Sequence, residues 1–198
     1  MIIFIYILST FEYNYIVNKI KEICRMKSCM DIMLTRRSVK SYKPDMPKRE
    51  DIDRIIEAGL AAASGRNMQA SVIVAVTNKE IRDRLSRDNA AIMGASADPF
   101  YGAPCVLVVL ASKIAHTYVY DGSLTLGNMM LAAHELGLGS CWIHRCKEVM
   151  AKPEWQEWIK SLGLEGEYEG VGNLVVGYCD GDFPAEKERK EGRVIYVD

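Results

Sequence analysis

The chain has 198 residues, of which 49% are hydrophobic and 26% are charged. This composition is typical of a globular domain and excludes a disordered, fibrous or multi-spanning membrane protein. Basic and acidic residues nearly balance, at 25 and 26, so no overall field attracts nucleic acid or a membrane, and any anion site must be local. A single domain of this length buries a sufficient core without metal or disulfide support.

The six cysteines are few and irregularly spaced, which indicates reduced thiols in a cytoplasmic protein rather than a disulfide framework. Cys141, His144 and Cys146 do not have the spacing of a zinc site, and alternate positions of a strand point to opposite faces. No metal site is expected.

Residues 1–8 form an apolar run with no basic residue before it and no small-residue cleavage site after it. The run is a poor signal peptide and is too short to cross a bilayer. Residues 11–25 carry a helical stripe that suits docking on a partner or a membrane surface. Residues 1–29 are therefore interpreted as an N-terminal extension, either a mobile helix or an over-called start if the natural chain begins at Met26 or Met30. Residues 30–198 form the expected domain.

Three segments have the pattern of helices. Residues 48–63 place apolar side chains at the spacing of one helix face, which predicts an amphipathic helix. Residues 121–138 are apolar almost all round and are followed by glycine, which predicts a buried helix. A shorter amphipathic helix is expected over residues 153–162.

The predicted strands are short, rich in β-branched residues and nearly uncharged. Residues 71–77 and 105–111 have the composition of strands buried on both faces, so they are expected at the centre of a sheet. Further strands are predicted over residues 140–144, 172–178 and 193–197. Helices mixed with strands in no strict alternation favour an α+β fold with one mixed sheet.

The densest positive charge beside a hydroxyl lies in residues 35–40, TRRSVK. Arg36, Arg37 and Lys40 offer bidentate and point-charge contacts to a phosphate, and Ser38 adds a short donor. This segment is an anion site in outline, although a solvated basic face has the same pattern.

A second candidate is the polar loop after the first predicted amphipathic helix, since binding groups often sit on such loops. Ser64, Asn67 and Gln69 can donate to and accept from the edge of a planar heterocycle, and Gly65 permits close approach of the backbone. The alternative interpretation is a helix cap followed by a turn.

Other chemistries find no support. The glycines of residues 137–144 follow a helix and precede a strand, and Trp142 stands where a dinucleotide fingerprint needs its third glycine. No serine or cysteine has the surroundings of a hydrolase nucleophile. Phosphate and ring contacts without a protein nucleophile, base or metal favour a redox cofactor that brings its own chemistry.

Residues 35–42 and 64–69, in this order and spacing, resemble the opening of the nitroreductase family of FMN-dependent oxidoreductases. The resemblance continues through residues 100–104 (FYGAP), 121–123 (DGS) and 136–144 (LGLGSCWIH), and it covers about residues 30–198. It implies a nitroreductase-like α+β fold, with a central mixed or antiparallel sheet flanked by helices. It also implies an obligate homodimer with FMN at the interface.

The resemblance implies a role for each candidate residue. The basic segment would hold FMN, with Arg36, Arg37 and Ser38 at the phosphate and ribityl end and Lys40 near the pyrimidine edge. The other subunit would supply the second motif, namely Ser64, Gly65, Asn67 and Gln69. Backbone donors would approach flavin N5 from Trp142, Ile143 and His144. The phosphate cradle would be completed by the tail residues Arg189, Lys190 and Arg193, of which Lys190 and Arg193 are favoured.

The implied activity is hydride transfer from NADH or NADPH to a nitroaromatic, quinone or similar small acceptor by a ping-pong mechanism. The flavin itself carries the hydride, so no catalytic protein acid or base is expected. The chain departs from the family pattern at Ala63, Ala70, Ser71 and His144, and these changes affect the substrate pocket. A flavin-binding sensor or carrier without turnover, a member with different reductive chemistry, and a flavin-free anion-binding protein are the alternatives.

Overall fold

A computed structural model describes residues 28–198, and the chain divides into two units, residues 1–34 and 35–198. The interpretations of residues 1–27 lie outside the described residues. Helix α2 (Cys29–Thr35), of which all residues but Thr35 belong to the first unit, begins with a reciprocal cap. The Asp31 amide donates to Ser28 Oγ over 3.1 Å, and the Ser28 amide donates to Asp31 Oδ2 over 3.0 Å, which satisfies two amides that a helix start leaves unpaired.

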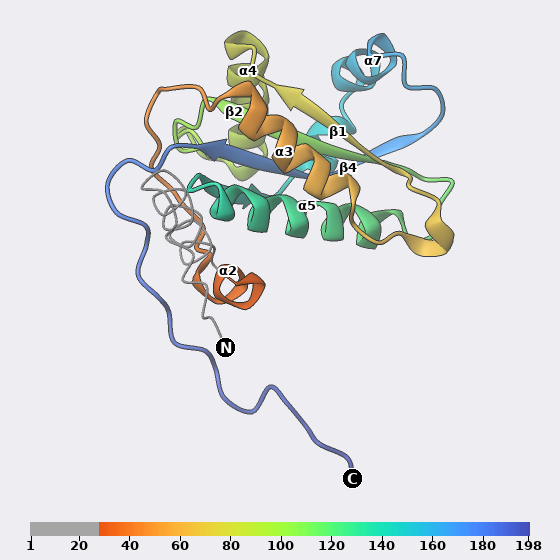
Figure 1. The fold of residues 1–198 in the computed structure, drawn as a ribbon. Helices are drawn as coiled ribbons and strands as arrows, with labels where there is room; N and C mark the ends of the chain where they lie inside the picture. The colour runs from red at the N-terminus through yellow and green to blue at the C-terminus, as the bar shows by residue number, and fades with distance from the viewer. Residues whose placement is uncertain (1–27) are drawn as a thin grey trace, which may run out of the picture. The chain divides into compact units, whose positions relative to one another are not determined.

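The second unit contains a four-stranded sheet and the helices that cover it (Figure 1). The strands are β1 (Ser71–Val76), β2 (Cys105–Ser112), β3 (Gly139–Ile143) and β4 (Tyr168–Gly177). The helices are α3 (Arg49–Leu60), α4 (Lys79–Met93), α5 (Tyr118–Glu135), α6 (Cys146–Met150), α7 (Pro153–Ser161) and the short 3-10 helix η1 (Gly65–Asn67).

The strand order is β1-β2-β4-β3, and each neighbouring pair is antiparallel. One parallel bridge, between Ser38 and Ser140, adds residues 36–40 beside β3. Residues 105–111 of β2 are completely buried, because helices pack on both faces of the sheet. The expected α+β fold is confirmed, and β2 is a buried central strand as predicted. The expectation that residues 71–77 are central and buried on both faces is wrong, because β1 lies at the edge of the sheet and only Val76 in it is buried.

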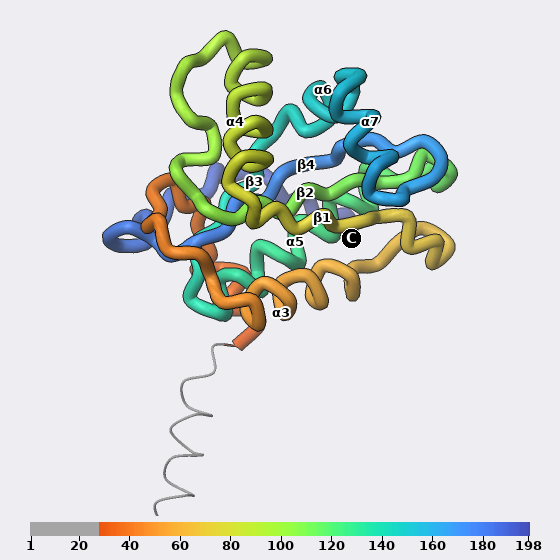
Figure 2. Tube along the Cα trace, turned by 90° about the horizontal axis from the view of Figure 1, so that it is seen from above, coloured from red at the N-terminus to blue at the C-terminus, as the bar shows by residue number. Residues whose placement is uncertain are grey.

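Helices α3 and α5 cover one face of the sheet, and α4, α6 and α7 cover the other (Figure 2). Each face has its own apolar cluster, centred on Leu107, Leu126 and Met129 under α5 and on Val108, Met150 and Trp155 under α6 and α7. No helix within residues 28–198 is long and apolar enough to cross a membrane.

Helix α4 occupies a stretch for which the sequence pattern led to no predicted element. Its ends nevertheless carry recognisable signals. Asn78 Oδ1 accepts from the Ile81 amide over 3.0 Å, and Gly94 closes the helix at φ +64°, as N-cap asparagine and C-terminal glycine commonly do. Met93, the last residue of α4, lines the pocket described below. The sequence pattern therefore did not predict this part of the pocket wall either.

Two other expectations need correction. Helix α5 begins at Tyr118, before the Asp121–Ser123 motif that was expected to open it. The strand predicted over residues 193–197 is not formed, and Val194 to Val197 are 68–93% exposed. A β-branched run becomes a strand only when a neighbouring strand satisfies its backbone groups, and no such neighbour lies beside it in the described part of this chain.

Candidate active site

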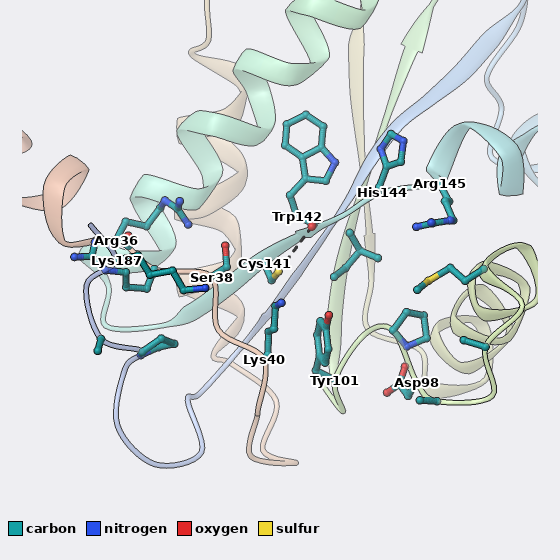
Figure 3. A pocket seen from close by; sticks show the side chains of 18 of the residues that line it. Arg36, Ser38, Lys40, Asp98, Tyr101, Cys141, Trp142, His144, Arg145 and Lys187 are labelled. Atoms are coloured by element: carbon teal, nitrogen blue, oxygen red, sulfur yellow. Dashed lines mark hydrogen bonds between the residues drawn. The ribbon is translucent and has the colours of Figure 1, made fainter. Parts of the chain in front are cut away.

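A pocket of about 760 Å³ lies where four segments of the second unit meet (Figure 3). They are the basic segment 36–40, the loop from Met93 to Tyr101, the end of β3 with the following turn to Arg145, and the tail from Pro184 to Arg189. This volume lies within the usual range for pockets that bury a cofactor or another small molecule.

The basic segment is held in place by β3. The Val39 amide donates to the Ser140 carbonyl oxygen over 3.1 Å, and the Val39 side chain is only 1% exposed. Gly139 allows this approach, since a Cβ there would lie 3.0 Å from three Val39 side-chain carbons. Because alternate residues of an extended segment point to opposite sides, burial of Val39 directs Ser38 and Lys40 into the pocket.

Positive charge in this segment is only partly compensated. Arg37 Nη2 lies 3.3 Å from Glu186 Oε1, and Arg37 Nη1 donates to the Arg36 carbonyl oxygen. Arg36 Nη1 is buried and has no hydrogen-bond partner within residues 28–198. Lys40 Nζ lies 5.8 Å from the centroid of the Tyr101 ring, so this ammonium faces an aromatic ring. A buried guanidinium nitrogen without a partner is costly unless a ligand oxygen accepts from it.

The wall opposite the basic segment is a turn built on one carboxylate. Asp98 Oδ1 accepts from the Phe100 amide over 2.9 Å, and Asp98 Oδ2 accepts from the Gly102 amide over 2.8 Å. The turn holds Tyr101 at φ +54°, which presents its ring to Lys40. Asp98 is therefore a positioning residue for the pocket.

Asp98 is also tied to helix α4. Arg82 Nη2 donates to Asp98 Oδ2 over 2.5 Å, and Ser86 Oγ donates to Asp98 Oδ1. Burial acts to raise the pKa of the Asp98 carboxyl, but the hydrogen bonds from Ser86, Arg82 and the two backbone amides outweigh burial and lower it. The ionised carboxylate is the form that holds the turn.

Asp98→Asn is expected to make the protein less sensitive to acid. Because the folded-state pKa lies below the unfolded value of about 3.9, the carboxylate stabilises the fold above that pH, and this contribution disappears as the pH falls through the folded-state pKa. The variant should be less stable than the wild type at neutral pH and should lose less stability on acidification. Urea unfolding at neutral and acidic pH measures this difference, with the exposed Glu165→Gln as control. Equal acid sensitivity in Asp98→Asn and wild type would contradict the role of Asp98.

Cys141 lies in the floor of the pocket between Ser38 and Lys40 (Figure 3). Burial raises the pKa of its thiol, although a hydrogen bond with Ser38 and the charges of Lys40 and Arg36 act in the opposite direction. Cys141 is therefore a neutral thiol at physiological pH, and nothing activates it as a nucleophile.

Non-glycine residues with left-handed backbone conformations gather in the candidate segments. Such residues are uncommon, and strain of this kind often marks functional sites. In the described part of the chain they are Arg66, Asn67, Gln69, Tyr101 and Arg145. Three belong to the second polar motif and two line the pocket, so both segments hold conformations that local preference alone would not select.

The second motif does not line this pocket. Ser64, Gly65, Asn67 and Gln69 lie at and around η1, beyond the C-terminal end of α3 (Figure 1). The Gly65 amide donates to Asp121 Oδ1 over 3.1 Å, and the Gln69 amide donates to Ser64 Oγ over 3.1 Å. The first bond attaches the loop to α5, and the second closes the loop on itself. The polar side chains of the loop therefore stay outside the pocket of their own chain.

The other predicted residues divide into two groups. Arg36, Arg37, Ser38, Lys40, Trp142, Ile143 and His144 all line the pocket. Lys190 and Arg193, the favoured tail residues, do not line it, whereas Arg189 of the same predicted group does, together with Lys187, which was not predicted. In an extended tail, residues two apart point to the same side, so the side chains of 187 and 189 face the pocket together.

Asp98, Tyr101 and Arg145 line the pocket but were not among the predicted site residues. Tyr101 lies inside one of the motifs that carry the family resemblance, which is a signal that could have found it. Arg145 directly follows the predicted residue His144. Asp98 has no comparable signal, because its role depends on contacts with α4.

The fold and the pocket together define an α+β protein with a cofactor-sized, cation-rich site. The model of a family described as "Nitroreductase family" matches residues 33–178. The chain belongs to this family, which confirms the resemblance seen in its motifs.

Known proteins of similar sequence and structure support the assignment of the chain to this family. An Archaeoglobus fulgidus protein with the provisional name NADH dehydrogenase/NAD(P)H nitroreductase is 31% identical over 123 residues, covering 60% of this chain and 68% of that protein. An FMN reductase (NAD(P)H) of Bacillus subtilis is 26% identical over 186 residues, covering 85% and 71%. The crystal structure of a nitroreductase with bound FMN from Bacteroides fragilis superposes with a TM-score of 0.78 at 26% identity, covering 87% of this chain and all of that one.

Proposed function

We propose that this protein is an FMN-dependent oxidoreductase that takes hydride from NADH or NADPH and reduces a nitroaromatic, quinone or similar small acceptor by a ping-pong mechanism. The observation that carries this proposal is the cation-rich pocket, in which Arg36 Nη1 is buried without a partner among the described residues. Support comes from the FMN bound to the Bacteroides fragilis relative and from the name of the Bacillus subtilis relative.

The residues of the pocket suit FMN. Arg36, Lys187 and Arg189 supply charge for a phosphate, and Ser38 supplies a short hydroxyl donor. When bound, FMN supplies the chemistry of accepting and donating hydride. Lys40 holds an ammonium inside the pocket, where it stabilises negative charge that develops during reduction.

The proposed active unit is a homodimer in which a second copy contributes Ser64, Gly65, Asn67 and Gln69. The homodimer follows from the family resemblance. It is compatible with the position of η1, whose residues do not line the pocket of their own chain. Val119, Tyr120 and Leu124 are exposed on α5, and apolar side chains grouped on a surface often mark an interface. The five cysteines that the structure describes are all free thiols, which is in keeping with the proposed cytoplasmic location.

The test is an anaerobic titration of the purified protein with NADPH and then NADH, while the visible flavin band is recorded. Loss of the band with either nucleotide is expected, and its recovery on adding a quinone completes the ping-pong cycle. A yellow protein that stays oxidised would contradict turnover and favour the sensor or carrier alternative. A colourless protein that does not bind added FMN would contradict the proposal as a whole.

A further inference from the structure

The pocket contains a second cationic group at the end away from Arg36. Figure 3 shows Arg36, Ser38 and Lys187 on one side of Lys40, and Arg145 on the other side, beyond Tyr101. Arg145 follows His144 in the turn between β3 and α6, and its side chain is half-buried. The pocket thus has two positive ends.

The charge of Arg145 is uncompensated within the part of the chain that the structure describes. Within residues 28–198 no carboxylate forms an ion pair with it. Asp98, the carboxylate that shares the pocket, uses both oxygens for Arg82, Ser86 and backbone amides. A half-buried guanidinium in this position is available to an anionic ligand.

The turn that carries Arg145 is held firmly. Arg145 has φ +71° and forms the N-cap of α6, and its carbonyl oxygen accepts from the Val149 amide over 3.0 Å. Asn89, fully buried in α4, donates to the His144 carbonyl oxygen over 2.8 Å. Since a left-handed arginine persists only where its surroundings enforce it, the guanidinium is presented from a fixed backbone.

The surroundings of Arg145 suit an organic anion better than a bare ion. Met93, Ala95 and Pro99 also line the pocket, and the Tyr101 ring lies between Lys40 and Arg145 (Figure 3). Apolar and aromatic surfaces beside a single guanidinium favour a planar molecule with one charged substituent.

We infer that Arg145, with His144 beside it, binds the anionic group of the molecule that exchanges hydride with the flavin. This inference rests on the proposed function, in which FMN phosphate occupies the Arg36 end and leaves the Arg145 end to the second reactant. A phosphate and a carboxylate are recognised by the same guanidinium geometry. The anion is therefore either the ribose phosphate of NADPH or a carboxylate on an aromatic acceptor.

The experiment compares Arg145→Gln and Arg145→Lys with wild type and with Arg54→Gln, an exposed arginine on α3 outside the pocket. One arm measures kcat/KM for NADPH and NADH. The other measures kcat/KM for para-nitrobenzoate and the neutral para-nitrobenzyl alcohol. Binding of NADP⁺, NAD⁺ and each nitro compound to the FMN-loaded protein is measured in parallel from the perturbation of the flavin spectrum.

Arg145→Gln is expected to lower kcat/KM and affinity for NADPH in one arm, or for para-nitrobenzoate in the other, by about 10- to 150-fold, the range for a hydrogen bond to a charged group. NADH or para-nitrobenzyl alcohol, which lacks the group that Arg145 binds, should stay close to wild type. Arg145→Lys should retain part of the effect, and Arg54→Gln should change nothing. Loss in the nucleotide arm identifies the phosphate, and loss in the acceptor arm identifies the carboxylate. Equal losses for the two members of each pair, or no loss in either arm, would overturn the inference.

The outcome is separable from that of the proposed function. FMN affinity, measured by fluorescence titration, should be the same in wild type and Arg145→Gln, which also shows that the variant folds. If wild type binds FMN and is reduced by a nucleotide, while Arg145→Gln changes kcat/KM and affinity in neither arm, only the role of Arg145 fails. If wild type does not bind FMN, the proposed function fails and this inference fails with it.

Discussion

Arg36→Ala is expected to weaken FMN binding by about 1.5 to 3 kcal/mol, or about 10- to 150-fold, the size of a hydrogen bond to a charged group. The reason is that Arg36 Nη1 is buried and unpaired among the described residues, so a ligand oxygen is the partner it lacks. Fluorescence titration of the apoprotein with FMN at fixed ionic strength measures the change.

A second measurement separates binding from folding. Removing a half-buried guanidinium whose Nη1 has no partner among the described residues should leave the ligand-free protein as stable as wild type or more stable. Added FMN should raise the Tm of Arg36→Ala less than that of wild type, since stabilisation by a ligand follows its affinity. Lys160→Ala, on exposed surface of α7 outside the pocket, is the control. Wild-type FMN affinity in Arg36→Ala would refute the assignment of this residue.

Gly170→Ala is expected to lower the free energy of unfolding by about 3 kcal/mol, at the upper end of overpacking effects. A Cβ at residue 170 would lie 2.5 Å from the Cys146 carbonyl oxygen and 2.7 Å from Cys146 Sγ. Because the nearest obstacle is backbone, no side-chain rotation relieves the clash, and α6 must move away from β4. Urea unfolding monitored by circular dichroism measures the loss.

The matched control is Gly127→Ala, in the middle of α5, where a Cβ would have open space. Alanine in a helix interior is favoured over glycine by about 0.5–1 kcal/mol, so this variant should be at least as stable as wild type. If Gly170→Ala is equally stable, the close packing of α6 on β4 is not required for the fold.

The elements with a strong local pattern could be predicted from the sequence. Strand β2 is an apolar β-branched run that is buried along its length, and α3 repeats apolar residues at helix spacing, so burial determines both. Strand β1 has the same composition but lies half-buried at the edge of the sheet, a position that composition does not report. The tail at residues 193–197 has the same local character as a strand but lies in extended, exposed chain. Its residues have a high intrinsic preference for extended backbone. A strand forms only where another strand lies alongside to pair with it, and intrinsic preference does not show whether such a strand is present.

The candidate site was predictable where recognition chemistry is local. Arg36, Ser38 and Lys40 could be chosen because charge and hydroxyl stand close together in the sequence. Tyr101 and Arg145 enter the pocket through left-handed backbone conformations that residues other than glycine rarely adopt. Tertiary contacts such as those of Asp98 and Asn89 impose these conformations. The local sequence therefore does not signal Arg145, and Tyr101 is signalled only by the family motif at residues 100–104.

The protonated state of Cys141 has a consequence for the chemistry of the acceptors. Quinones are electrophiles that become covalently attached to thiolates, and the reactive form of cysteine is the thiolate. Burial raises the pKa of the Cys141 thiol despite the nearby Lys40 and Arg36, so an electrophile that enters the pocket meets a neutral thiol. Burial of this thiol therefore protects the protein from inactivation by the compounds that it is proposed to reduce.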